Sequence, residues 1–216
     1  MNIILLGLPG SGKGTQARLL AESLKHFYFE SGDFSREMAK TNPRIKEIVE
    51  KGELIPEEEM TKYVSEYLEA NIKDFGSIVF DGYPRFITQY QFLSGWLEEK
   101  NFGIDKVIVL NVNEAEIIKR LSARRTCIKC DRVYNLITNP PPQDKCECGG
   151  EIIQREDDKP EAIKERFEWY KNNTFLMIEY VKKTYPDIFI EIEGVRPIDV
   201  IQKDIIERIG IDDAKN

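Results

Sequence analysis

Residues 7–15 carry the clearest chemical signal in the chain and read Gly-Leu-Pro-Gly-Ser-Gly-Lys-Gly-Thr. Apolar residues precede this segment and a helical pattern of apolar residues follows it, so we expect strand, turn and helix in that order. Glycines let successive backbone N–H groups turn toward an anion, and a helix N-terminus adds partial positive charge. The segment therefore predicts a loop that holds the phosphates of a nucleoside triphosphate through Gly10, Ser11, Gly12, Lys13, Gly14 and Thr15.

One residue of this loop departs from the usual pattern. Ser or Thr normally follows the lysine directly, whereas here Gly14 stands between Lys13 and Thr15. A direct hydroxyl contact to magnesium is therefore less favoured, and water would supply more of the metal's ligands.

Two further segments have side chains suited to phosphate. Asp81 and Arg85 follow a short apolar run, so Asp81 is expected at the carboxyl end of a strand, where it can hold magnesium through water. Arg85 offers a planar fork that matches a phosphate. Ser31, Gly32 and Asp33, with Arg36 one helical turn later, suit a phosphate and a ribose, although a capped helix start explains Ser31 and Asp33 equally well.

All four cysteines lie in one segment, at Cys127, Cys130, Cys146 and Cys148. In a reducing compartment such clustering favours a metal over disulfides. Four thiolates fit a tetrahedral structural zinc site without an open position. Unmetallated thiols or a distorted site are the alternative.

The composition limits the kinds of partner that the protein can have. The chain has 216 residues, of which 41% are hydrophobic and 32% charged, with a formal net charge of -7. This balance suits a globular protein and disfavours a diffuse nucleic-acid-binding surface. An anionic substrate then requires positive charge that is concentrated locally. The N-terminus lacks a signal-peptide pattern and no stretch approaches a membrane span, so we expect a cytoplasmic protein.

The hydrophobic pattern predicts an α/β fold. Short apolar runs suited to strands buried on both faces occur at residues 3–6, 78–80, 107–110 and 188–192. Helical segments lie between them, including one that opens at Asn113 and runs toward Arg125, and one that opens at Pro56. Strands that alternate with helices predict a parallel sheet covered on both faces, with Trp96 and Trp169 as packing residues. Residues 30–55 and 126–156 do not follow this alternation of strands and helices. They are expected as insertions over the carboxyl edge of the sheet.

The loop variant Gly-x-x-Gly-x-Gly-Lys-Gly-Thr resembles that of the nucleoside monophosphate kinases, and the other motifs resemble the adenylate kinase family in its form with a long, zinc-bearing lid. The resemblance runs from residue 1 to about 194. It implies a P-loop NTPase-type core made of residues 1–29, 60–121 and 160–216, a helical monophosphate-binding subdomain at 30–59 and a β-rich lid at 122–159. It also implies reversible, Mg²⁺-dependent transfer, ATP + AMP = 2 ADP, by a cytoplasmic monomer whose partners are small nucleotides.

The resemblance carries further site residues with it. For catalysis it implies Lys13, Arg85, Arg120, Arg124, Arg155 and Arg166, with Arg120 and Arg124 expected on one helix face. The ATP site would add Val133, Tyr134 and Arg196. The AMP site would comprise Ser31, Arg36, Glu53, Leu54, Ile55, Gly82, Arg85, Gln89, Arg155 and Arg166, and magnesium would be held through water by Asp33 and Asp81. The sequence departs from the family pattern at Phe86, where Thr is usual, at Asp131, where Gly is usual, and at the single-residue gap filled by Glu147.

Other functions fit parts of the sequence. A kinase for UMP, CMP or GMP is the nearest alternative, and Gln89 and the long cysteine-bearing lid argue against it. A zinc-ribbon nucleic-acid adaptor with a P-loop conflicts with the isoelectric point of about 5.1. An ATP-dependent switch without a second substrate would leave Arg36, Arg85 and Gln89 without a purpose.

Overall fold

A five-stranded parallel sheet forms the centre of the protein. The computed structural model describes residues 1–51 and 53–211. The strand order is β2-β3-β1-β4-β8. The strands are β1 (Ile3–Gly7), β2 (Phe27–Glu30), β3 (Ile78–Asp81), β4 (Lys106–Asn111) and β8 (Phe189–Glu193). The four predicted apolar runs thus supply four of the five strands, and the predicted α/β class is confirmed.

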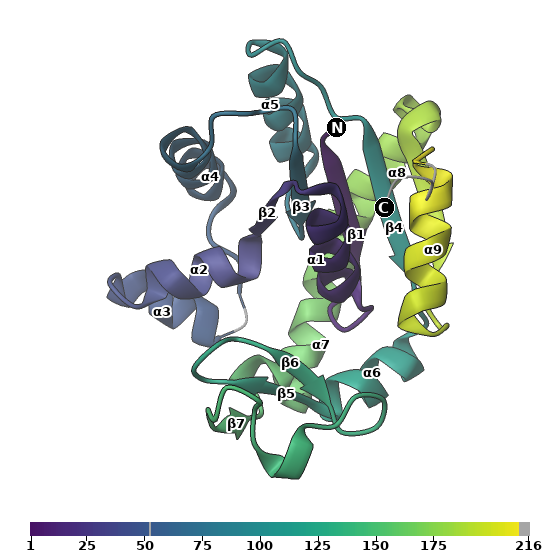
Figure 1. The fold of residues 1–216 in the computed structure, drawn as a ribbon. Helices are drawn as coiled ribbons and strands as arrows, with labels where there is room; N and C mark the ends of the chain where they lie inside the picture. Colours follow the sequence, from purple (N-terminus) through teal and green to yellow (C-terminus); the bar gives the residue numbers. More distant parts are fainter. Residues whose placement is uncertain (52, 212–216) are drawn as a thin grey trace.

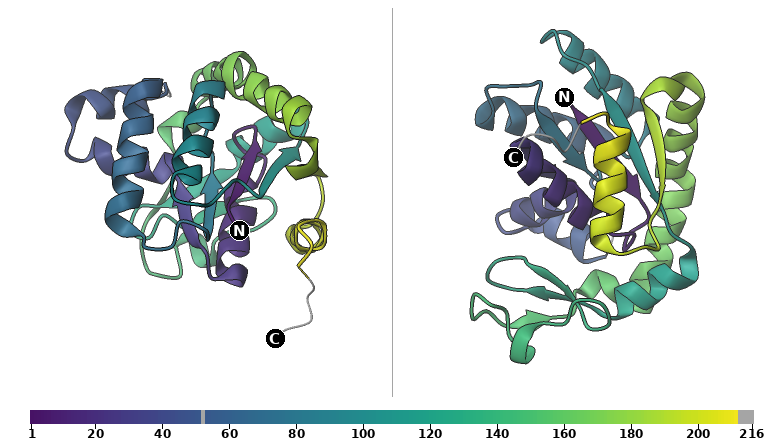
Figure 2. Two further views of the ribbon diagram at one scale, coloured as in Figure 1. Left: turned by 90° about the horizontal axis from the view of Figure 1, so that it is seen from above. Right: turned by 45° about the vertical axis from the view of Figure 1, so that its right-hand side comes forward.

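Helices cover both faces of this sheet, and others lie beyond one of its edges. They are α1 (Lys13–Leu24), α2 (Ser31–Ala39), α3 (Pro43–Glu50), α4 (Glu57–Asn71), α5 (Ile87–Glu98), α6 (Glu114–Ser122), α7 (Pro160–Trp169), α8 (Phe175–Thr184) and α9 (Ile198–Arg208). Side chains of a strand alternate between faces, so Ile3 and Leu5 pack with α1 and α9, whereas Ile4 and Leu6 pack with α4, α5 and α8. Seen from above, α5 and α8 lie on one side of the sheet and α1 and α9 on the other (Figure 2, left).

A second, smaller sheet lies in the cysteine-containing segment. It is antiparallel, with the order β6-β5-β7, and consists of β5 (Arg124–Cys127), β6 (Val133–Asn135) and β7 (Ile152–Ile153). Short 3₁₀ turns occur at Pro142–Asp144, Glu156–Asp158 and Pro186–Ile188, and a π-helical turn, Tyr170–Thr174, joins α7 to α8. Within the described residues no helix is both long and apolar enough to span a bilayer.

The carboxyl ends of the parallel strands define the edge where ligands bind in such folds. Glu30 lies in register with Asp81, and Gly7 lies in register with Leu110. Near this edge, helices α2 and α3 lie at the left of the view and the small sheet lies below them (Figure 1). Both predicted insertions therefore lie near the carboxyl edge.

Two sequence interpretations of local structure were wrong. The helix that opens at Asn113 ends at Ser122, so Arg124 lies on β5 and does not share a helix face with Arg120. The chain leaves the helix because residues 124–126 pair with β6 in the small sheet, and this pairing replaces the helical hydrogen bonds. Strand β2 was also missed, because the aromatic run Phe27–Glu30 follows directly on α1 and does not alternate in polarity.

Candidate active site

The glycine-rich loop joins β1 to α1 with the geometry of an anion-binding turn. Gly10 and Gly12 take positive φ values of 86° and 95°, which favour glycine. At Gly10 a Cβ atom would lie 2.8 Å from Leu121, so the space also demands glycine. Helix α1 begins at Lys13 without a side-chain cap and has no acidic residue in its first turn. Its first N–H groups and its dipole are therefore available to phosphate oxygens.

Lys13 brings a cation to the mouth of this loop. Burial lowers the pKa of its ammonium to about 8, with Asp81 acting in the opposite direction and Arg85 and Arg166 adding repulsion. A lysine enclosed with two arginines is short of counter-charge. The surroundings of Lys13 therefore favour a bound anion.

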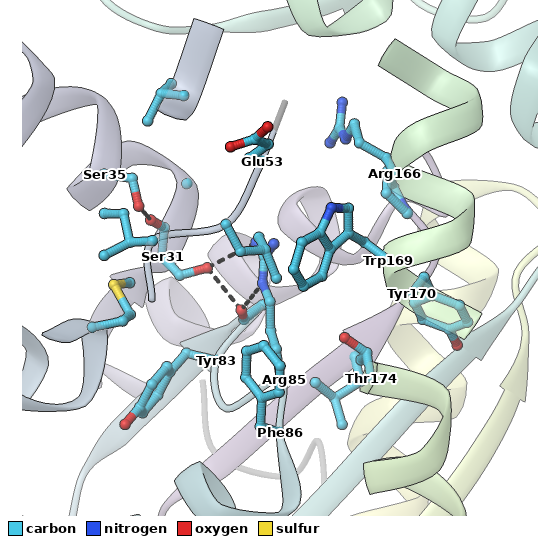
Figure 3. A pocket seen from close by; sticks show the side chains of 18 of the residues that line it. Ser31, Ser35, Glu53, Tyr83, Arg85, Phe86, Arg166, Trp169, Tyr170 and Thr174 are labelled. Atoms are coloured by element: carbon cyan, nitrogen blue, oxygen red, sulfur yellow. Dashed lines mark hydrogen bonds between the residues drawn. The ribbon is translucent and has the colours of Figure 1, made fainter. Parts of the chain in front are cut away.

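One cavity unites residues from distant parts of the chain. Phosphate-loop, α2 and α7 residues line it together with the residues around Arg85; they include Pro9, Lys13, Ser31, Arg36, Glu53, Leu54, Ile55, Gly82, Arg85, Phe86, Gln89, Arg166, Trp169 and Thr174. Figure 3 shows Arg85 between Ser31 on one side and Trp169 on the other, with Arg166 above. Most of the residues predicted for AMP thus share a single cavity with Lys13.

Arg85 is fixed in this cavity by two hydrogen bonds. Its Nε donates to the carbonyl of Gly82 at 2.7 Å and its Nη2 donates to Ser31 Oγ at 3.1 Å (Figure 3). Its backbone N–H donates to Gln89 Oε1 at 2.9 Å, and Gln89 Nε2 lies 3.3 Å from the carbonyl of Glu57. Burial lowers the pKa of Arg85 from its ordinary value. The guanidinium is held in place before any substrate arrives.

Arg36 faces the same cavity from α2. It pairs with Asp33, and its Nη2 lies 3.4 Å from Glu30 Oε1. Asp33 also lies 3.6 Å from Arg18 Nη2. Nearby Glu30 and Arg36 lower the pKa of Asp33, while burial acts in the opposite direction. Asp33 therefore stays ionised, but its oxygens are shared with two arginines.

Asp81 has the features expected of a group that holds magnesium through water. It ends β3 and its residue is only 2% exposed. Its Oδ2 accepts a hydrogen bond of 2.9 Å from Tyr28, whereas Oδ1 is buried and has no hydrogen-bond partner among the residues that the structure describes. Burying a carboxylate oxygen without a hydrogen-bond partner costs free energy unless a water molecule or an ion contacts it. The residues present therefore fit a hydrated cation beside the phosphates.

The space around Asp81 also accounts for Gly14. A Cβ atom at residue 14 would lie 3.0 Å from Asp81 Oδ2. A serine or threonine after Lys13 would therefore crowd the carboxylate. Glycine at position 14 thus leaves space for the Asp81 carboxylate beside the loop.

The remaining predicted arginines gather around two acidic residues of the 3₁₀ turn Glu156–Asp158. Arg124 Nε donates to Asp158 Oδ2 at 2.7 Å, and Arg166 Nη1 lies 2.9 Å from Asp157 Oδ2. Arg155 Nε donates to Thr126 Oγ1 at 2.9 Å. Burial, with other arginines nearby, lowers the pKa of both Arg155 and Arg166 to about 10. The positive charge that the acidic sequence required is therefore concentrated at this end of the sheet.

Arg120 reaches the phosphate loop from α6. Its Nη1 lies 3.2 Å from the carbonyl of Ser11 and its Nη2 lies 3.0 Å from the carbonyl of Gly194, while Glu116 holds its Nε at 2.9 Å. It therefore contacts the backbone of the phosphate loop at Ser11.

Three residues predicted for the ATP site do not line the cavity. Arg196 pairs with Asp204 at 2.6 Å, and Val133 is exposed on the small sheet. Tyr134 is only 3% exposed, and its hydroxyl lies 3.3 Å from Cys146 Sγ. Any contact of Tyr134 with ATP would have to be made by its backbone. The ATP roles of these residues remain predictions.

The structure adds residues that the sequence interpretation left out. Trp169, interpreted as a packing residue, is 38% exposed and lines the cavity, whereas Trp96 is buried in the core as expected. Trp169 is the last residue of α7 and follows by three residues Arg166, which lines the same cavity. Tyr28 of β2 donates a hydrogen bond to Asp81, and Glu30, which lies in register with Asp81, contacts the same tyrosine hydroxyl. Only recognition of β2 as a strand in register with β3 would have brought them to this edge.

The four cysteines lie together in the small sheet. Their sulfur atoms all lie within 4.8 Å of one another, with Cys127 and Cys148 at 3.5 Å and Cys130 and Cys148 at 3.3 Å. All four are free thiols. Four sulfurs at about 2.3 Å from a tetrahedral zinc ion lie roughly 3.8 Å apart. The cluster therefore fits a zinc site.

The two departures near the cysteines are accommodated locally. Asp131 takes a φ of 56°, the left-handed conformation that the usual glycine would adopt and that aspartate tolerates. At Gly150, which follows the single-residue gap, a Cβ atom would lie 2.5 Å from Cys127 Sγ. The turn after the second cysteine pair therefore closes tightly over the sulfurs.

Comparison with known proteins agrees with this geometry. The family model described as adenylate kinase matches residues 5–185. An adenylate kinase of Archaeoglobus fulgidus is 41% identical over 95% of this chain and 96% of its own length. Those of Petrotoga mobilis and Thermotoga maritima are 38% and 36% identical, over 95% and 98% of this chain and of their own lengths. The chain therefore belongs to the adenylate kinase family and is a phosphotransferase of the nucleoside monophosphate kinase type.

Proposed function

We propose that this enzyme catalyses ATP + AMP = 2 ADP. The observation that carries the proposal is the shared cavity, in which Lys13 of the phosphate loop, Arg85 and Arg166 line one space with Ser31 and Gln89. A triphosphate held by the loop and a monophosphate held beside Arg85 would meet there. This arrangement serves two nucleotides, whereas a simple ATP-dependent switch would need only the loop.

The proposed chemistry is direct transfer, without a covalent enzyme intermediate. The transition state spreads charge over the phosphoryl oxygens, so catalysis consists mainly of positioning and electrostatic stabilisation. Lys13 would hold the terminal phosphates of ATP, while Arg85 and Arg36 would hold the phosphate of AMP. Arg120, Arg124, Arg155 and Arg166 would surround the group in transfer. Arg124 and Arg166 pair with Asp157 and Asp158, and Arg120 contacts the phosphate loop at Ser11, which supports this role.

Asp81 and Asp33 would hold Mg²⁺ through water. The bound ion would neutralise charge on the ATP phosphates. Asp81 is the better supported of the two, since its Oδ1 is buried and has no partner in the described part of the chain. Asp33 is already shared between Arg18 and Arg36.

We propose that residues 30–59 and 122–159 close over the core formed by residues 1–29, 60–121 and 160–216. Phosphoryl transfer requires that water be excluded, or ATP would be hydrolysed. Two features support this division. The small sheet has its own buried cluster of Cys127, Tyr134 and Cys146. The segment that holds α2 and α3 supplies Ser31, Arg36 and Glu53 to the cavity.

We further propose that the cysteines bind one structural Zn²⁺. Few apolar side chains are buried in the small sheet, so a metal would supply much of its stability. Contacts to the sulfurs from Tyr134 and from the backbone N–H of Lys129 would support the thiolates. Thiols kept reduced also suit a cytoplasmic enzyme. We also propose that the enzyme is a monomer whose partners are small nucleotides, because residues of a single chain line the cavity.

Removal of this metal should destabilise the small sheet. We expect purified protein to contain about one equivalent of zinc and Cys146→Ser to contain almost none, with a thermal midpoint lower by several degrees. Metal analysis and thermal unfolding measure the two effects. Ile137→Ser is the matched control, because Ile137 is exposed on the same segment and lies outside the cluster. Less than a tenth of an equivalent of zinc in the unmodified protein would end the zinc proposal.

Substrate choice tests the proposed reaction. With ATP as donor, we expect kcat/KM for AMP to exceed that for UMP, CMP or GMP by about 100-fold, because Gln89, which lines the cavity, is the residue that we propose binds the adenine. Coupled assays of ADP formation across the four monophosphates measure this ratio. Equal or greater turnover of a pyrimidine monophosphate would assign the enzyme to a sister activity and would make Phe86 the first residue to examine.

A further inference from the structure

Tyr28 joins two acidic residues at the carboxyl edge of the sheet. It lies on β2, where Glu30 stands in register with Asp81 of β3. Its hydroxyl oxygen lies 2.9 Å from Asp81 Oδ2 and 3.0 Å from Glu30 Oε2. The proposed mechanism gives neither Tyr28 nor Glu30 a part in the reaction.

A phenol carries one proton and can donate to only one of these carboxylates at a time. Glu30 has cations nearby, since Arg18 Nη2 lies 3.3 Å from its Oε2 and Arg36 Nη2 lies 3.4 Å from its Oε1. The hydrogen-bond partner of Asp81 Oδ2 in the described structure is Tyr28. The more deeply buried carboxylate has more to gain from a donor. The hydroxyl proton therefore belongs to the bond with Asp81.

This bond limits how the Asp81 carboxylate can turn. The tyrosine hydroxyl contacts Oδ2 on one side. On another side lies Gly14, where an added Cβ atom would come within 3.0 Å of Oδ2. With Oδ2 engaged, Oδ1 is the oxygen that remains to accept a hydrogen bond. The two oxygens of Asp81 thus have different tasks.

We propose that Tyr28 is a positioning residue for magnesium. By holding Oδ2, it presents Oδ1 to a water of the metal that accompanies ATP. This inference rests on the proposed role of Asp81. Residues that orient a ligand in this way commonly contribute 10- to 100-fold to metal affinity. Glu30 pairs with Arg18 and Arg36 and leaves the tyrosine proton to Asp81.

Metal binding tests the inference apart from turnover. The probe is Mn²⁺, titrated by electron paramagnetic resonance into enzyme saturated with a bisubstrate analogue in which two adenosines are joined by a phosphate chain. We expect Tyr28→Phe to weaken Mn²⁺ binding by about tenfold, with AMP binding changed by less than about twofold. In turnover, excess Mg²⁺ should restore most of the lost kcat. A merely structural role would not produce this dependence on the metal.

Tyr67→Phe is the matched control. Its ring packs on Phe29 nearby, and its hydroxyl makes no hydrogen bond to any described residue, so Mn²⁺ affinity should be unchanged. If Tyr28→Phe does not fold, Gly14→Ala supplies the second test, because its methyl group should push Oδ2 away from Tyr28 and weaken Mn²⁺ binding similarly.

The outcomes separate the two proposals. If Asp81→Asn weakens Mn²⁺ binding but Tyr28→Phe binds Mn²⁺ within twofold of the unmodified enzyme, the positioning role is overturned and the role of Asp81 stands. If Asp81→Asn itself leaves Mn²⁺ affinity unchanged, both proposals fail.

Discussion

Lys13→Met is expected to lower kcat by at least about 10²–10³-fold, because it removes a cation that meets developing charge on the transferred group. Lys13 lies at the start of α1, and its surroundings include Arg85 and Arg166. Methionine has a similar length but no charge, so nothing else in the cavity is displaced. Steady-state turnover at saturating ATP and AMP measures the effect.

The loss should not reflect unfolding. Burial opposes the charge of Lys13 and lowers its pKa to about 8, so a neutral side chain at this position should keep the thermal midpoint or raise it. Lys62→Met is the matched control, since Lys62 is exposed on α4 and lies 3.8 Å from Glu66. Near-normal turnover in Lys13→Met would overturn the assignment of the phosphate loop.

The lowered pKa of Lys13 also predicts how kcat/KM depends on pH, and a substitution at Lys13 should change that dependence. A lysine with a pKa of about 8 loses its proton as pH rises through 8, so kcat/KM of the unmodified enzyme should fall above that value. Lys13→Arg keeps its charge through this range, and its residual activity should lack that decline.

Arg85→Ala is the second change with a large expected effect. We expect kcat/KM for AMP to fall by at least about 10²–10³-fold, with the KM for ATP little changed, because Arg85 lies beside Ser31 and Gly82 on the monophosphate side of the cavity. Varying each nucleotide in turn separates the two constants. Arg85→Lys should recover only part of the loss, since an ammonium cannot form the two parallel hydrogen bonds of the fork.

The surroundings of Arg85 should tolerate the truncation. Ser31 Oγ still donates to the carbonyl of Gly82 at 2.7 Å, and Gln89 still accepts from the backbone of residue 85. Arg44→Ala is the control: Arg44 is exposed and pairs with Glu59 through two hydrogen bonds of 2.7 and 2.8 Å, so it removes an ion pair outside the cavity. An equal rise in KM for both nucleotides in Arg85→Ala would contradict a monophosphate-specific role.

Local patterns in the sequence were sufficient for the parts of the site that form within one segment. The phosphate loop depends on glycines at positions where φ is positive, at a junction between an apolar run and a helix. The cysteine pairs gather because each pair lies on one short turn. The four apolar runs became strands because a sheet covered on both faces accepts only such runs.

Other features depended on where distant segments meet. Arg124 left the predicted helix because pairing with β6 supplied its backbone hydrogen bonds, and Asp158, 34 residues away, then fixed its side chain. Trp169 lines the cavity because α7 packs against α6 and against Leu8 of the phosphate loop, which are distant in the sequence.

The sequence by itself therefore determined the fold class, the phosphate loop and the grouping of the cysteines in one segment. Only the tertiary structure decided that Tyr28 and Glu30 stand against Asp81, and that Gly14 leaves room for its carboxylate. The reason is physical: a motif records which groups one short segment can offer, whereas strand register and helix packing decide which groups from separate segments come within hydrogen-bonding distance.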